Sequence, residues 1–226
     1  WGGNVSHCSA ECTVTGSASA VSCTADKGYI YIGGLIGASD GDSTSGYSNI
    51  SNCTANCTTT GTITSQSGAM VPYAYVGGLV GVCNYYSSIE NCSSFGSVSS
   101  SAAAAGSVVP YVYAGGLVGM DQYFSTVDSC SSSCSVTGSS SSESSNVRAY
   151  VGGLAGYNFF ATIQDSYADG DVSGSGIYAY VGGLVGMNRK YSTKTTTYDS
   201  SVVNCYSRGD VSGSAVNESY LGGLIG

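Results

Sequence analysis

The sequence predicts an all-β fold, a right-handed parallel β-helix of about six turns in which residues 1–226 form a single β-solenoid. The first observation behind this prediction is a Gly-Gly-Leu-x-Gly motif that recurs about every 37 residues. The second is that spacing within each unit is constant, whereas the loops between units vary in length. The third is poor helix propensity, with 34 Gly and abundant Ser and Thr. The motif begins at Gly33, Gly77, Gly115, Gly152, Gly182 and Gly222.

The segment that leads into each motif alternates a tyrosine with a smaller apolar residue, as expected of a strand with one face buried. We expect the aliphatic column to face inward, because it adjoins the motif leucine and a slim core has little room for phenol rings. The tyrosines then form a surface aromatic ladder. Such a ladder could stack on sugar rings or on a neighbouring rod, but the favoured interpretation is that it stabilises the sheet. Its members are Tyr31, Tyr75, Tyr113, Tyr150, Tyr180 and Tyr220.

The motif itself predicts a sharp bend, since glycines let the chain turn tightly and allow neighbouring backbones to come close. We expect the motif leucines to form one interior column. They are Leu35, Leu79, Leu117, Leu154, Leu184 and Leu224. A single unit has too few apolar residues to bury a face alone, so successive units must coil and pair in parallel. Parallel crossovers are overwhelmingly right-handed, which is the basis for the predicted hand.

After each motif comes a loop and then an apolar residue, with Cys or Ser three positions later; these Cys and Ser residues form the first cysteine column. Four residues further on stands Cys or Gly, and these positions form the second cysteine column. Two interpretations of the cysteines stay open. Either Cys8–Cys12, Cys53–Cys57 and Cys130–Cys134 pair across a corner, or small buried thiols form an unbonded ladder with Ser166 as an isostere. If Cys83 pairs with Cys92, then Cys23 and Cys205 remain, and these could join adjoining molecules.

The units resemble the GLUG motif repeat. The copy from Gly182 to Ser214 is the closest, and the likeness extends over essentially the whole chain. This resemblance implies a bacterial surface or secreted protein, such as an adhesin-like molecule or a non-catalytic region of an immunoglobulin A protease, with no chemistry of its own. The chain departs from the usual pattern where Cys12, Cys57 and Cys134 replace Gly.

Composition favours the same compartment. Ten Cys with only 9% charged residues are typical of an oxidising, extracellular environment. A net charge of -8 argues against nucleic-acid binding, and no apolar run reaches membrane-spanning length. The chain starts without Met or a signal peptide, which we interpret as a mature or excised segment of a longer fibre. N-glycosylation sequons occur at Asn4, Asn49, Asn52, Asn56, Asn91 and Asn217.

No residue cluster points to catalysis, a metal or a cofactor. His7 is the only histidine, which excludes a zinc-peptidase HExxH site. Stacking of the turns should place Asp171 beside Asp210. In the favoured interpretation this pair is structural, and the alternatives are a cation site or an acid/base dyad.

The sequence therefore predicts a structural subunit of an extracellular fibre or cell-surface adhesin. Its expected partner is itself, in a head-to-tail homopolymer, with surface glycans or receptors as further candidates. The alternative is a carbohydrate-binding or carbohydrate-cleaving solenoid that uses the tyrosine ladder or the acidic pair. The even spread of identical residues over all turns favours the structural function, because an active site concentrates irregular polar residues at one place.

Overall fold

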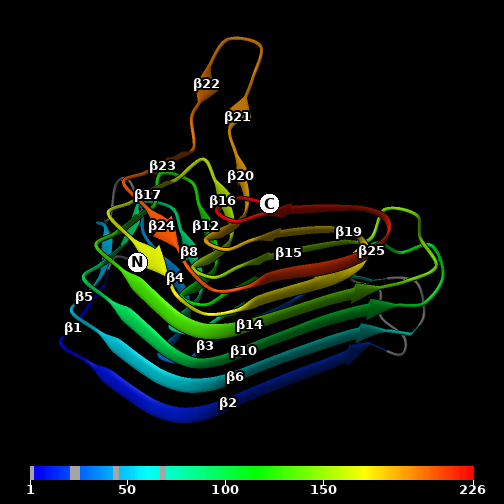
Figure 1. The fold of residues 1–226 in the computed structure, drawn as a ribbon, viewed down its shortest axis with the longest axis horizontal. Helices are drawn as coiled ribbons and strands as arrows, with labels where there is room; N and C mark the ends of the chain where they lie inside the picture. Colours follow the sequence, from blue (N-terminus) through cyan, green and yellow to red (C-terminus); the bar gives the residue numbers. More distant parts are fainter. Residues whose placement is uncertain (1–2, 21–25, 43–45, 67–69) are drawn as a thin grey trace.

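The computed structural model describes residues 3–20, 26–42, 46–66 and 70–226. These residues contain strands and no helix, and the strands stack in successive turns to form a parallel β-helix (Figure 1). The predicted fold class is confirmed. Successive turns contribute equivalent strands to the parallel sheets, and each of these strands pairs with its equivalent in the neighbouring turn.

The first sheet consists of short strands that carry the apolar column ahead of the first cysteine column. In sheet order they are β1 (Asn4–Ser6), β5 (Ser48–Ser51), β9 (Ser87–Glu90), β13 (Thr126–Asp128), β17 (Thr162–Gln164) and β23 (Ser201–Val203).

The second and largest sheet has 12 strands. Its long Ser/Thr-rich strands lie side by side in Figure 1, and they are β2 (Ser9–Ala20), β6 (Thr54–Ser65), β10 (Ser93–Ala104) and β14 (Ser131–Ser141). Its tyrosine-bearing strands are β3 (Lys27–Gly33), β7 (Val71–Gly77), β11 (Tyr111–Gly115) and β15 (Arg148–Gly152). In the last two turns the two kinds of strand merge into β19 (Val172–Gly182) and β25 (Val211–Gly222), preceded by β18 (Tyr167–Ala168) and β24 (Tyr206–Ser207).

The third sheet follows the glycine motif, and its strands are β4 (Ile36–Asp40), β8 (Val80–Asn84), β12 (Val118–Gln122), β16 (Ala155–Phe159) and β20 (Val185–Arg189). The longest connection forms a separate antiparallel hairpin of β21 (Tyr191–Ser192) and β22 (Thr197–Tyr198), which projects away from the stacked turns in Figure 1. Length variation between repeats is thus accommodated outside the solenoid.

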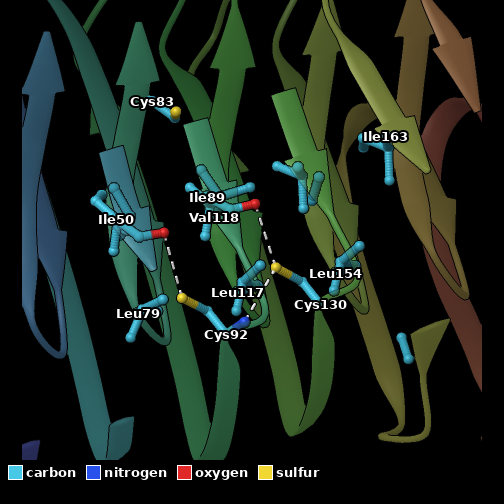
Figure 2. Close-up of a cluster of buried hydrophobic side chains, with 14 of the residues drawn as sticks. Ile50, Leu79, Cys83, Ile89, Cys92, Leu117, Val118, Cys130, Leu154 and Ile163 are labelled. Atoms are coloured by element: carbon cyan, nitrogen blue, oxygen red, sulfur yellow. Dashed lines mark hydrogen bonds between the residues drawn. The ribbon is translucent and has the colours of Figure 1, made fainter. Parts of the chain in front are cut away.

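The interior confirms the predicted columns. Leu79, Leu117, Leu154 and Leu184 are fully buried, and Leu35 packs against the same cluster. Leu224, in the last turn, is 37% exposed because no further turn covers it in the described chain. Figure 2 shows how the motif leucines lie beside the isoleucine column of Ile50, Ile89 and Ile163. A second interior cluster holds the aliphatic column that alternates with tyrosine, confirming that this column faces inward.

The motif glycines are required where backbones meet. A Cβ on Gly119 would lie 2.6 Å from Gly81 O and 2.7 Å from Val76 N. A Cβ on Gly78 would overlap the carbonyl oxygen of Gly116 in the next turn. Because no side chain fits at such distances, the motif allows the chain to turn tightly and the third sheet to approach the backbone of the tyrosine-bearing strands.

Candidate functional site

The first cysteine column forms a hydrogen-bonded ladder of thiols. The backbone N–H of Cys53 donates to the sulfur of Cys92 at 3.4 Å, and that of Cys92 donates to the sulfur of Cys130 at 3.4 Å. Each thiol in turn contacts the carbonyl oxygen two residues before it, as Cys92 does with Glu90 O at 3.2 Å. Figure 2 shows this ladder running alongside the apolar columns. Ser166 occupies the following rung and accepts the N–H of Cys130 at 3.0 Å.

The residue before each Cys or Ser of the first cysteine column explains why the chain can turn at that point. These residues adopt a left-handed conformation with φ between 48° and 55°: His7, Asn52, Asn91, Ser129, Asp165 and Asn204. Asn, Asp and His tolerate this conformation better than other non-glycine residues. The corner therefore precedes the first cysteine of each pair rather than separating it from the second.

The structure does not place the two cysteines of a turn on opposite sides of a corner, as the predicted disulfides within a turn require. All nine described cysteines are free. Cys53 and Cys57 follow the same corner, and β6 continues from Thr54 through Cys57. Residues four apart on a strand lie about 13 Å apart, beyond disulfide reach. The same holds for Cys8–Cys12 and Cys130–Cys134. The competing interpretation, a thiol ladder with Ser166 as isostere, agrees with the observed hydrogen bonds.

The other suggested pairings stay predictions. Cys83 and Cys92 are both free and occupy different parts of the core in Figure 2. Cys205 is also free, and its sulfur contacts Val203 O at 3.1 Å. Cys23, its proposed partner across a junction between molecules, lies outside the described residues.

The tyrosine ladder lies on the outward face of its strands, but it is not a solvent-exposed surface in the central turns. Tyr75 and Tyr113 are each 8% exposed and Tyr150 is 5% exposed, whereas Tyr31 and Tyr220 at the two ends are 43% and 42% exposed. Consecutive rings stack with centroids 4.7–5.2 Å apart. Because their faces contact one another, the central rings are not available to stack on a sugar.

The central tyrosines are buried because they belong to a third apolar cluster outside the main core. The bend at the glycine motif brings the outward face of the tyrosine-bearing strands against Val82, Met120 and Tyr157 of the third sheet. Tyr157 meets Tyr150 edge-on with centroids 4.9 Å apart. Burial raises the pKa of Tyr75, Tyr113 and Tyr150 above the ordinary value. The interior column was assigned correctly, but the outer column is also packed.

A second aromatic stack was missed by the sequence reasoning. The rings of Tyr86 and Phe124 stack with centroids 4.9 Å apart, and the rings of Phe124 and Phe160 meet edge-on with centroids 4.1 Å apart. All of these residues have positive φ, so they mark another left-handed corner. The available signal was an aromatic dipeptide after three successive motifs: Tyr85-Tyr86, Tyr123-Phe124 and Phe159-Phe160.

A buried polar column follows the third sheet, where Cys83, Asp121 and Asn158 are successive register partners. Ser125 donates its hydroxyl to Asp121 Oδ1 at 2.5 Å. Asp121 Oδ2 and Asn158 Oδ1 are buried without a hydrogen-bond partner. Burial raises the pKa of Asp121 to about 7, despite hydrogen bonds from Ser125 and Cys83 that lower it. The protonated form of the Asp121 carboxyl carries a hydroxyl donor that the ionised form lacks.

The acidic pair is brought together as predicted. The backbone N–H of Asp210 donates to Asp171 Oδ1 at 2.8 Å. This hydrogen bond gives the Asp171 carboxylate a structural role at the junction between turns. Arg208, two residues before Asp210, places its guanidinium 5.0 Å from the centre of the Tyr206 ring. Within the described ranges, no group of three or more His, Cys, Asp or Glu is arranged to hold a metal ion.

The sequon residues are at the surface with one exception. Asn4, Asn52, Asn56, Asn91 and Asn217 are exposed, whereas Asn49 is partly covered and its Oδ1 is buried. His7 is likewise exposed at its corner. Among the described residues, no helix has the length and apolar character needed to span a membrane.

Comparison with known proteins supports the resemblance seen in the sequence. The family model of the GLUG motif matches residues 73–99 and 148–173. Each match begins in a tyrosine-bearing strand and ends in the following Ser/Thr-rich segment, so it covers one complete passage through the glycine bend and the left-handed corner. The comparisons found no match among curated proteins or solved structures.

Proposed function

Because the chain is a parallel β-solenoid with GLUG motif repeats, we propose that it is a structural subunit of an extracellular fibre or cell-surface adhesin that assembles head-to-tail by stacking of turns. The observation that carries this proposal is the uniform register. Tyr75 pairs with Tyr31 on one side and Tyr113 on the other, and its neighbours repeat the same pairing. A scaffold spreads identical residues along its length in this way.

The strand edge of the last described turn supports stacking. β25 pairs with β19, and its other edge has no partner in the described chain. Leu221, at 49% exposed, continues the interior column of Val151 and Val181. A further turn with an aliphatic residue in this column would bury Leu221 and satisfy the free backbone groups of the edge. That turn could come from a second copy in a heterologous, non-closing contact, which produces a filament.

The test is assembly of the chain in solution, followed by sedimentation and electron microscopy over a range of concentrations. We expect filaments, and we expect Leu221→Asp to prevent them because it places a charge in the column that must be buried. Ser139→Asp is the matched control, since Ser139 is exposed on the outward face of β14 and not on an edge. Monomers at every concentration, or equal loss of filaments in both variants, would overturn head-to-tail stacking.

The extracellular location rests on the motif and on the exposed sequons. The thiol ladder gives the first-column cysteines a packing role that does not depend on an oxidising compartment, so their number is weaker support than the composition suggested. The carbohydrate alternative is also less supported. The central ladder rings stack on one another, and Asp171 accepts a backbone hydrogen bond.

A further inference from the structure

The second cysteine column contains a pair of sulfurs in direct contact. Cys12 on β2 and Cys57 on β6 are register partners in neighbouring turns. Their sulfurs lie 2.9 Å apart. Each sulfur is farther from the carbonyl oxygens around it: Cys12 lies 3.5 Å from Gly34 O, and Cys57 lies 3.7 Å from Ala10 O. The sulfur–sulfur contact is therefore the closest polar contact that either thiol makes across turns.

The remaining cysteines of both columns are placed differently. In the first column each central sulfur accepts a backbone N–H from the preceding turn and contacts the carbonyl oxygen two residues before it, as Cys92 and Cys130 do. In the second column, Cys134 has Gly96 as its register partner on one side. On the other side, Gly170 lies against the Cys134 backbone. Cys134 thus has no second-column sulfur next to it.

We propose that Cys12 and Cys57 form a disulfide between consecutive turns, which joins β2 covalently to β6. Neighbouring strands lie about 4.8 Å apart, and disulfides bridge Cα atoms separated by about 4.4–6.8 Å. The spacing of neighbouring strands therefore lies within the Cα range of a disulfide. This bridge is distinct from the pairs within a turn that the sequence suggested, because it uses one cysteine from each of two turns.

The oxidant is a small-molecule disulfide such as oxidised glutathione. Cys12 is exposed and Cys57 is buried, so the Cys12 thiolate attacks the oxidant first. One glutathione leaves as a thiol, and a mixed disulfide remains on Cys12. The Cys57 sulfur then loses its proton and attacks the Cys12 sulfur, which expels the second glutathione. Two protein thiols become one disulfide while one glutathione disulfide becomes two thiols, so electrons and protons balance.

The bridge would act on a strand at the edge of its sheet. β2 pairs with β6 in the described chain and has no partner on its other edge. An edge strand opens locally at low free energy, because it lacks the hydrogen bonds and contacts of a strand with two neighbours. A covalent link to β6 restricts the conformational freedom that the open state gains.

The test is non-reducing peptide mapping of the folded chain after equilibration with a glutathione redox buffer. We expect a Cys12–Cys57 linkage, with Cys134 recovered as a free thiol in the same digest. Hydrogen exchange of β2 amides should slow at least about tenfold on oxidation, with little change in β14.

Two variants separate this bridge from other oxidation products. Cys12→Ser should abolish the redox dependence of exchange in β2. Cys8→Ser, which alters another exposed cysteine of the same turn, should retain it. The proposal is overturned if Cys12 and Cys57 are both alkylated as free thiols after oxidation of the folded chain. It is also overturned if the mapped bridge joins other cysteines.

Discussion

The backbone N–H of Cys130 donates to Ser166 Oγ at 3.0 Å, where Cys53 and Cys92 donate to a cysteine sulfur of the following turn. Ser166 also donates its hydroxyl to Gln164 O at 2.6 Å. Serine and cysteine thus perform the same task, which is to satisfy a buried backbone donor at each corner.

We predict that Ser166→Cys preserves the ladder and changes the unfolding free energy by less than about 1 kcal/mol. Ser166→Ala leaves the Cys130 N–H without its acceptor and should cost about 1–3 kcal/mol. Urea unfolding monitored by circular dichroism measures both, with Ser139→Ala as an exposed control. Equal stability of the Ala and Cys variants would contradict a hydrogen-bonding role.

The buried Asp121 predicts stability that falls as pH rises. Its pKa is raised to about 7 in the folded chain by burial, against an unfolded value of about 4. Below pH of about 4 both states are protonated and stability is greatest. Between these values the unfolded state ionises first, so stability falls by about 1.4 kcal/mol per pH unit and then levels off.

Asp121→Asn should flatten this slope and raise stability at pH 8, because an amide is neutral and Asn158 already occupies the adjacent register position. Denaturant titrations from pH 4 to 8 measure the slope. Asp199→Asn, at an exposed position, should leave the profile as in the parent chain. An unchanged slope in the Asp121 variant would mean that this carboxyl is not the group responsible.

The packed tyrosine ladder predicts a large cost for truncation. Tyr113→Ala removes a buried ring that contacts its neighbours in both adjoining turns, and it should lower the unfolding free energy by about 3–5 kcal/mol. Tyr47→Ala, at a ring that is 67% exposed, should cost less than about 1 kcal/mol. Similar costs at the two positions would indicate a solvent-exposed ladder.

The motif glycines predict intolerance of even one methyl group. Gly119→Ala places a Cβ within 2.6–2.7 Å of backbone atoms that cannot move independently, and it should cost about 3 kcal/mol or more. Gly3→Ala is the control, because a Cβ there meets nothing within 4 Å. Thermal unfolding of the two variants beside the parent chain is the measurement, and a normal melting temperature for Gly119→Ala would refute the close backbone approach.

Sequence was sufficient for the solenoid, the parallel pairing and the buried leucine and aliphatic columns, because a strict repeat forces equivalent residues into register. Tertiary structure decided the tyrosines and the cysteines. Tyr113 is buried because the bend at Gly115 and Gly116 brings two outward faces together, and strand alternation alone cannot reveal that contact. Cys53 and Cys57 lie on one extended segment because the left-handed corner at Asn52 precedes both of them. The position of a corner depends on backbone conformation, which the spacing of cysteines along the chain does not specify.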